Sequence, residues 1–169
     1  MTRALAGRGL ELLGPFHGRV AIVGSHAARL TAALPPGTPV AGRDEEIGAA
    51  IVTFLGERAV PAARQALLAE LRARLPRAAP VVVIDHNQAR VWWRRTLGAA
   101  ALALHGLGPQ RARYPVAREL AILGFDVERL RLAHGERVQL VAARRGRPCG
   151  PGGEQVERRG PEDGGEELS

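Results

Sequence analysis

Three stretches of the sequence are apolar almost without interruption and rich in branched side chains: RVAIV (19–23), AAIVTFL (49–55) and PVVVIDHN (80–87). Such runs are typical of strands that are buried on both faces of a parallel sheet. Segments with helical spacing follow the first two runs, at 26–34 and 61–75. Strands that alternate with helices predict an α/β fold, with a mostly parallel sheet and helices on both of its faces.

The segment TPVAG (38–42) predicts a weaker strand, with Pro39 at its start or at a sheet edge. Only residues 45–48 separate Asp44 from the next predicted strand at 49–55. A parallel crossover needs about 10–12 residues. We therefore expect that 38–42 is not a regular strand, or that the sheet is rearranged at this edge.

Two alternating segments, FDVERLRLA (125–133) and ERVQLVAARR (136–145), flank turn-forming residues around Gly135. This pattern predicts an antiparallel hairpin that closes the sheet.

Three further features concern the helices. The helix over 61–75 has a leucine stripe and Arg64 on another side; the stripe is Leu67, Leu68, Leu71 and Leu75. A second helix is predicted over 89–107, where we expect one of Trp92 and Trp93 to pack inward and the other to be half exposed. A third is predicted over 115–124.

The chain of 169 residues predicts one folded domain over 19–145, preceded by a helix and turn over 1–18. Residues 146–169 are rich in Gly, Pro and charge, with little to bury, and are predicted to be disordered. The single cysteine, Cys149, lies there and is given no catalytic role.

The net charge of +7 raises the question of nucleic-acid binding. Every basic residue is an arginine, and the arginines are scattered without interleaved aromatic residues. The charge is also uneven, with 21 arginines against 11 acidic residues in 1–145 and 3 against 6 in 146–169. A nucleic-acid partner is therefore kept as an alternative but not favoured.

No apolar run reaches the ~18 residues of a membrane span, and no secretory signal is visible, so no membrane association is predicted. A chain with one cysteine cannot form an internal disulfide, which favours the cytoplasm. The histidines have no metal-ligand spacing, and no metal is predicted. The motifs of serine hydrolases and P-loop enzymes are missing.

Gly24, Ser25 and His26 follow the first predicted strand directly. Ligands of open α/β sheets bind at the carboxyl ends of strands, so this turn is a candidate cofactor loop. The alternative is an ordinary turn between strand and helix, with Ser25 as the helix cap.

The layout of these segments resembles class I S-adenosylmethionine-dependent methyltransferases, with a Rossmann-like sheet. RVAIVGSHAARLTAAL is similar to the family's first strand, glycine loop and first helix, and PVAGRD to its second strand. The stretch 49–87 resembles its fourth strand, the helix that follows and its fifth strand. The stretch 112–145 resembles its last helix and the closing strand pair. The resemblance implies S-adenosylmethionine as cofactor, with Asp44 on the ribose.

The same resemblance places Thr53 and Phe54 close to the bound molecules. It also exposes two departures from the family pattern. The loop keeps one glycine, Gly24, where the family often has three, and His26 stands at the second of those positions. The family's third strand has no counterpart in the short connection after Asp44.

Asp85 and His86 follow a buried strand and are candidates to line a pocket and to move a proton. The alternative is that Asp85 or Asn87 caps the next helix.

We predict a shortened, divergent methyltransferase or methyltransferase-like protein, with a small-molecule acceptor or a protein partner. Whether it is an enzyme is left open. The alternatives are a non-catalytic binding or regulatory module on the same fold and a basic nucleic-acid-associated protein.

Overall fold

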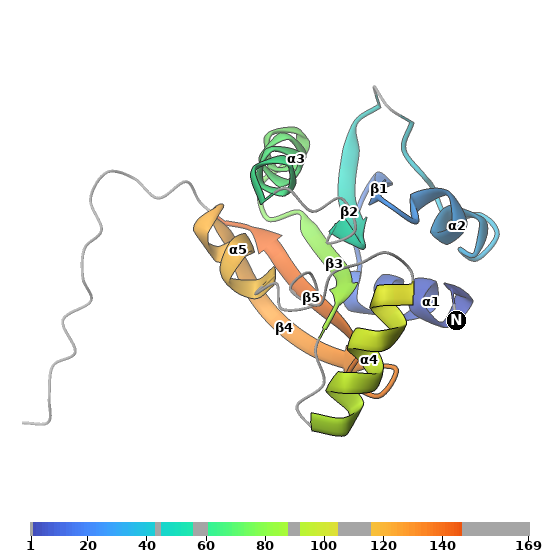
Figure 1. The fold of residues 1–169 in the computed structure, drawn as a ribbon. Helices are drawn as coiled ribbons and strands as arrows, with labels where there is room; N and C mark the ends of the chain where they lie inside the picture. The colour runs from blue at the N-terminus through green and yellow to red at the C-terminus, as the bar shows by residue number, and fades with distance from the viewer. Residues whose placement is uncertain (1, 43–44, 56–60, 88–91, 105–115, 147–169) are drawn as a thin grey trace, which may run out of the picture.

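A computed structural model gives the structure of the chain and describes residues 2–42, 45–55, 61–87, 92–104 and 116–146 (Figure 1). Five strands form one sheet in the order β1-β2-β3-β5-β4. The strands are β1 (Arg19–Gly24), β2 (Ile47–Thr53), β3 (Pro80–His86), β4 (Phe125–Ala133) and β5 (Val138–Arg145). The helices are α1 (Thr2–Leu13), α2 (Ala27–Ala32), α3 (Pro61–Arg74), α4 (Trp92–Leu104) and α5 (Val116–Ile122).

The sheet is mixed in the way the sequence predicts. Strands β1, β2 and β3 are parallel, β5 runs antiparallel to β3, and β4 pairs antiparallel with β5. The hairpin turn has positive φ angles at His134, Gly135 and Glu136. The α/β fold with a closing antiparallel hairpin is thus confirmed.

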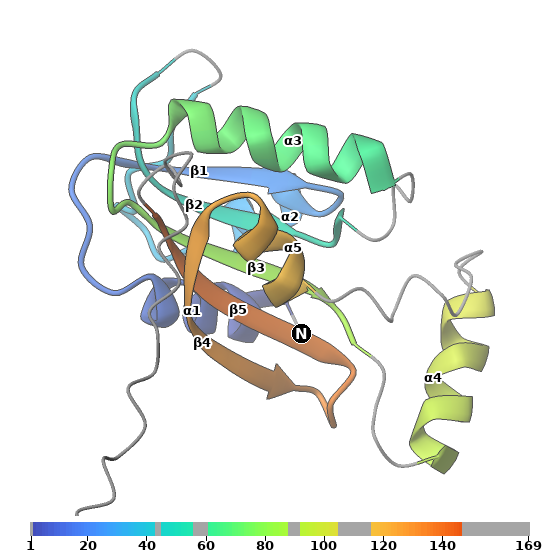
Figure 2. The ribbon, with the colours of Figure 1, turned by 90° about the vertical axis from the view of Figure 1, so that its left-hand side faces the viewer.

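Helices cover both faces of the sheet (Figure 2). On one face, α3 and α5 pack against alternate strand residues such as Val81 and Val83. On the other, α1 and α2 pack against Val82 and Ile84. Because side chains alternate along a strand, neighbouring residues of β3 belong to two separate cores.

The predicted strand at 38–42 is reduced to a single parallel bridge between Val40 and Val20. Val20 donates its N–H to the Pro39 carbonyl at 2.8 Å and accepts from the Ala41 N–H at 2.9 Å. This bridge lies near the amino end of β1, where Arg19 pairs with Ile47 at the start of β2. The segment at 38–42 and β2 therefore both meet β1 near its amino end. A few residues are enough to connect them, and a crossover along the full length of β1 is not needed.

Helix α4 carries both tryptophans of the chain, and in Figure 2 it stands apart from the sheet. Trp92 is 70% exposed and Trp93 47%. The prediction that one tryptophan packs inward is wrong, since neither is buried. None of the described helices has the length and apolarity that crossing a membrane requires.

Candidate functional site

The carboxyl ends of the three parallel strands meet at one edge of the sheet. Gly24 pairs with Thr53, and Thr53 with Ile84, so the residues after each strand lie side by side. This common edge is the place where open α/β sheets bind their ligands.

Gly24 is required by the approach of the two strands. Its φ is +119°, and a Cβ at this position would lie 1.9 Å from the Thr53 carbonyl oxygen. Ser25 donates its backbone N–H to that same oxygen at 3.0 Å. The need for glycine at position 24 is therefore explained by strand packing, independently of any ligand.

Ser25 does not cap the helix that follows. The residue before α2 is His26, which makes no side-chain cap hydrogen bond. The Ser25 hydroxyl is buried and has no hydrogen-bond partner among the described residues. An unsatisfied buried hydroxyl is uncommon and costly, so it marks a position where a ligand atom could bind.

Three rings gather above the strand ends. The Phe54 ring lies 5.2 Å from the His26 ring, edge to face, and 4.8 Å from the His86 ring at a tilt of 48°. Phe54 is buried and has a φ of +47°. A left-handed backbone costs an L-residue roughly 1–2 kcal/mol, so the surrounding contacts hold Phe54 in a strained conformation.

A cavity of about 120 Å³ opens beside these rings. Pockets for small molecules generally measure about 300–1,000 Å³. S-adenosylmethionine, the cofactor that the sequence resemblance implies, therefore does not fit the pocket in this conformation. The cavity is lined by Leu5, His26, Arg29, Leu30, Thr53, Phe54 and His86.

Asp85 and His86 are neighbours in sequence, but their environments differ. His86 lines the small cavity, whereas Asp85 is fully buried and bound to Arg64 of α3, with Nη1 and Oδ2 2.9 Å apart. The other Asp85 oxygen accepts the His86 backbone N–H at 2.8 Å. The structure thus does not bring the two predicted proton carriers into one pocket.

Arg64 also binds Glu119 of α5, through Nη2 at 2.9 Å and Nε at 3.3 Å. Burial raises the pKa of the Asp85 carboxyl above its ordinary value, although Arg64 acts in the opposite direction. Burial lowers the pKa of Arg64, but hydrogen bonds and charges of Glu119 and Asp85 outweigh it and raise that pKa overall.

Arg64 was predicted to lie on a different side of α3 from the leucine stripe, and this prediction is wrong. Arg64 is 2% exposed and lies on the buried face of the helix. The spacing of Arg64 to the buried Leu68, Leu71 and Leu75 is that of residues on one face of a helix. This spacing could have shown from the sequence that Arg64 lies on the buried face. Glu119 was also not predicted, although it lies between the buried Val116 and Leu120 of α5.

The predicted ribose acid, Asp44, lies outside the described residues. Its described neighbours Gly42 and Glu45 are joined by a hydrogen bond of 2.7 Å, and Glu45 lies 3.2 Å from Arg19. Arg19 begins β1, so these neighbours lie at the amino edge, away from Gly24.

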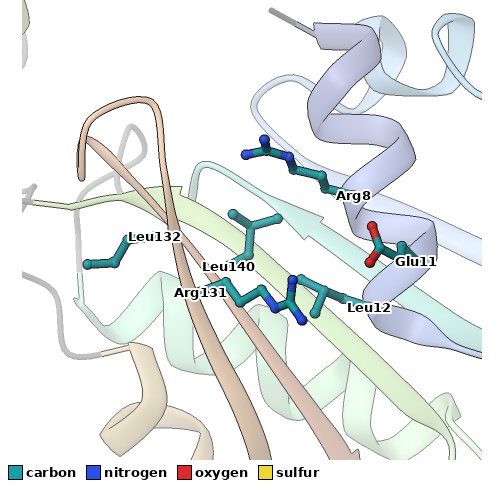
Figure 3. Close-up of a pocket in the computed structure, with 6 residues that line it drawn as sticks. All are labelled: Arg8, Glu11, Leu12, Arg131, Leu132 and Leu140. Atoms are coloured by element: carbon teal, nitrogen blue, oxygen red, sulfur yellow. The ribbon is translucent and has the colours of Figure 1, made fainter.

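A larger cavity of about 410 Å³ lies between α1 and the β4–β5 hairpin (Figure 3). Arg8 and Glu11 line it from α1, and Arg131 from β4, over the apolar side chains of Leu12 and Leu140. All three charged residues are exposed. This cavity lies beside the β4–β5 hairpin, and none of the predicted site residues lines it.

No family model matches the sequence. No curated protein matches it either.

Solved structures, in contrast, share the fold. The pyocyanin biosynthetic protein PhzM is 21% identical, with a TM-score of 0.60 over 84% of this chain and 55% of its own. The mitomycin 7-O-methyltransferase MmcR is 15% identical, with a TM-score of 0.57 over 85% of this chain and 52% of its own. PigF, solved with SAH, is 12% identical, with a TM-score of 0.52 over 77% and 50%.

The chain thus spans about half the length of each of these three proteins. The sheet order, the closing hairpin and these matches agree with the resemblance seen in the sequence. The chain has the fold of the class I S-adenosylmethionine-dependent methyltransferases.

Proposed function

We propose that this chain is a methyltransferase-type domain that binds S-adenosylmethionine, or its demethylated product S-adenosylhomocysteine (SAH), at the carboxyl edge of β1, β2 and β3. The observation that carries the proposal is that the parallel strands end together: Gly24 pairs with Thr53, and Thr53 and His86 line one cavity. Ser25, the residue after Gly24, adds a buried hydroxyl with no hydrogen-bond partner among the described residues, although it does not line that cavity. The shared fold supports it, since MmcR is named as a methyltransferase and PigF was solved with SAH.

In this proposal Gly24, Ser25, His26, Thr53 and Phe54 surround the cofactor. The acceptor is a small molecule, because MmcR and the mitomycin in its name suggest one.

His86 is the residue we assign to proton transfer from the acceptor. It is half-buried and lines the cavity, and a neutral imidazole has one ring nitrogen that can accept a proton. Asp85 then acts indirectly, because its carboxylate accepts the His86 backbone N–H from the opposite face of the sheet.

Isothermal titration calorimetry with SAH and with S-adenosylmethionine tests the proposal. We expect heat of binding at ~1 mM ligand and a rise in melting temperature. Ser25→Ala should weaken binding, whereas Thr31→Ala, an exposed hydroxyl on α2, should not. Binding that is equally strong in both variants would remove Ser25 from the site. No heat with either ligand, in the wild type and in a Phe54→Ala variant whose pocket is wider, would overturn the assignment.

The second candidate is a non-catalytic module on the same fold. Two observations favour it: Gly24 is explained by contact with Thr53 alone, and the Phe54 ring takes up space at the strand ends. This candidate predicts no binding of either ligand even when the pocket is opened.

A further inference from the structure

Phe54 is the bulky apolar residue that lines the small cavity between its two histidines. It follows β2 directly, and the residue is 6% exposed. The ring contacts one imidazole from each side of the edge, His26 before α2 and His86 at the end of β3. Both histidines line the one small cavity with Phe54, so removing this ring would enlarge that cavity between them.

The backbone of Phe54 is held in a conformation that a phenylalanine rarely adopts. Its φ of +47° lies in the left-handed region, and its N–H donates to the Ile84 carbonyl at 2.7 Å. Strained residues of this kind persist where their surroundings fix them, and they cluster at ligand sites. A change of the backbone to an ordinary φ would relieve this strain and would also move the side chain from its present place.

The place that the ring would leave is suited to a ligand. The residue before Phe54 is Thr53, which lines the cavity and whose carbonyl accepts the Ser25 N–H at 3.0 Å. Arg29 and the two histidines add groups that can donate hydrogen bonds to a ligand.

We propose that Phe54 closes the carboxyl-edge pocket, and that a ligand binds by displacing the Phe54 ring from its place between His26 and His86. This inference rests on the proposed function, because it concerns the same site. It makes Phe54 the residue that sets the affinity of the pocket for its ligand.

The first test measures SAH binding by calorimetry for the wild type, Phe54→Ala and Phe54→Leu. Phe54→Ala removes the ring, whereas Phe54→Leu keeps most of the apolar bulk and serves as the matched control. If the pocket is open in about 1–10% of molecules, its apparent affinity is reduced to that fraction of the affinity of the open pocket. We therefore expect Phe54→Ala to bind SAH about tenfold to a hundredfold more tightly than the wild type, and Phe54→Leu to stay within about threefold of the wild type.

The outcomes separate this inference from the proposed function. Equal SAH affinity in the wild type and folded Phe54→Ala would overturn the role of Phe54 and leave the proposed function intact. No binding in any folded variant would overturn the proposed function. Circular dichroism shows whether each variant is folded.

The second test uses the wild type alone and does not depend on a variant. Nuclear Overhauser effects between the Phe54 ring protons and the His26 and His86 imidazole protons should be present without ligand and disappear at saturating SAH. Their persistence in the SAH complex would overturn the inference.

Discussion

The Nη1 atom of Arg64 lies 2.9 Å from Oδ2 of Asp85, and the two side chains are 1% and 0% exposed. Glu119 binds the same guanidinium from the other side. One arginine thus ties together α3, β3 and α5, which are far apart in the sequence. Among the described residues, both buried carboxylates bind this one buried guanidinium, and the stability of the domain should depend on it.

Replacing Arg64 by Met should strongly destabilise the protein, because Asp85 and Glu119 would remain buried without the guanidinium that binds both of them. Losing one partner of a buried ion pair costs about 3–5 kcal/mol. Arg144→Met is the matched control, since Arg144 pairs with Glu128 where both side chains are about two-fifths exposed (41% and 44%). That exposed pair should contribute about 0–1 kcal/mol. Urea unfolding followed by circular dichroism measures both, and similar losses in the two variants would contradict the role of Arg64.

The pH dependence of stability should reveal the titration of Asp85. Burial raises its pKa above the ordinary value of 3.8, so the folded protein holds this proton more tightly than the unfolded chain does. The tighter binding of this proton adds to the free energy of unfolding. That addition is fully present below pH 3.8 and is lost as the pH rises through the higher pKa of the folded state.

Asp85→Asn removes this titration. The free energy of unfolding of the wild type minus that of the variant should fall as the pH is raised from 3.8, and then level off. Urea titrations at a series of pH values give this difference directly. A difference that stays constant or grows with pH would show that the pKa of Asp85 is not raised.

Gly24→Ala should destabilise the domain by about 3 kcal/mol or more, through backbone strain and the clash with the Thr53 carbonyl. Gly7→Ala is the control. Gly7 lies inside α1, and a methyl group added there would have no other atom within 4 Å, so alanine should stabilise by about 0.5–1 kcal/mol. Thermal and urea unfolding distinguish the two directions. A neutral Gly24→Ala would mean that β1 and β2 can move apart at their carboxyl ends.

The two tryptophans should report on α4 alone, because the chain has no others. Since both are exposed, their fluorescence should be quenched readily by iodide in the folded protein. Trp92→Ala should change the free energy of unfolding by no more than about 0.5 kcal/mol, as is usual for surface positions. Blue-shifted emission that iodide fails to quench would show that another surface covers α4.

The sequence predicted the three parallel strands well because buried strands need apolar, branched side chains on both faces, and few other structures do. The closing hairpin could also be predicted, because its alternating apolar residues and its turn around Gly135 are local features of the sequence. The segment 38–42 was harder. Its pairing with β1 is a single bridge at Val40, and the number of paired residues depends on where the chain goes next.

The site was predicted only in part. The positions of Gly24, Thr53 and His86 follow from the strand ends, so the edge could be found from the sequence. Which face of the sheet each strand side chain occupies was harder to predict. Asp85 was expected to line the same pocket as His86. The strained backbone of Phe54 leaves no mark in the sequence, because only the packing of neighbouring residues imposes it.

The alternation of Asp85 and His86 across the sheet has a practical consequence. A change made beneath the sheet, at Arg64 or Glu119, can alter the polarity of a peptide bond that belongs to the histidine above it, without touching any atom that a ligand would meet. A substitution at Glu119 would thus act on the His86 peptide group through Arg64 and Asp85, from the face of the sheet opposite the small cavity.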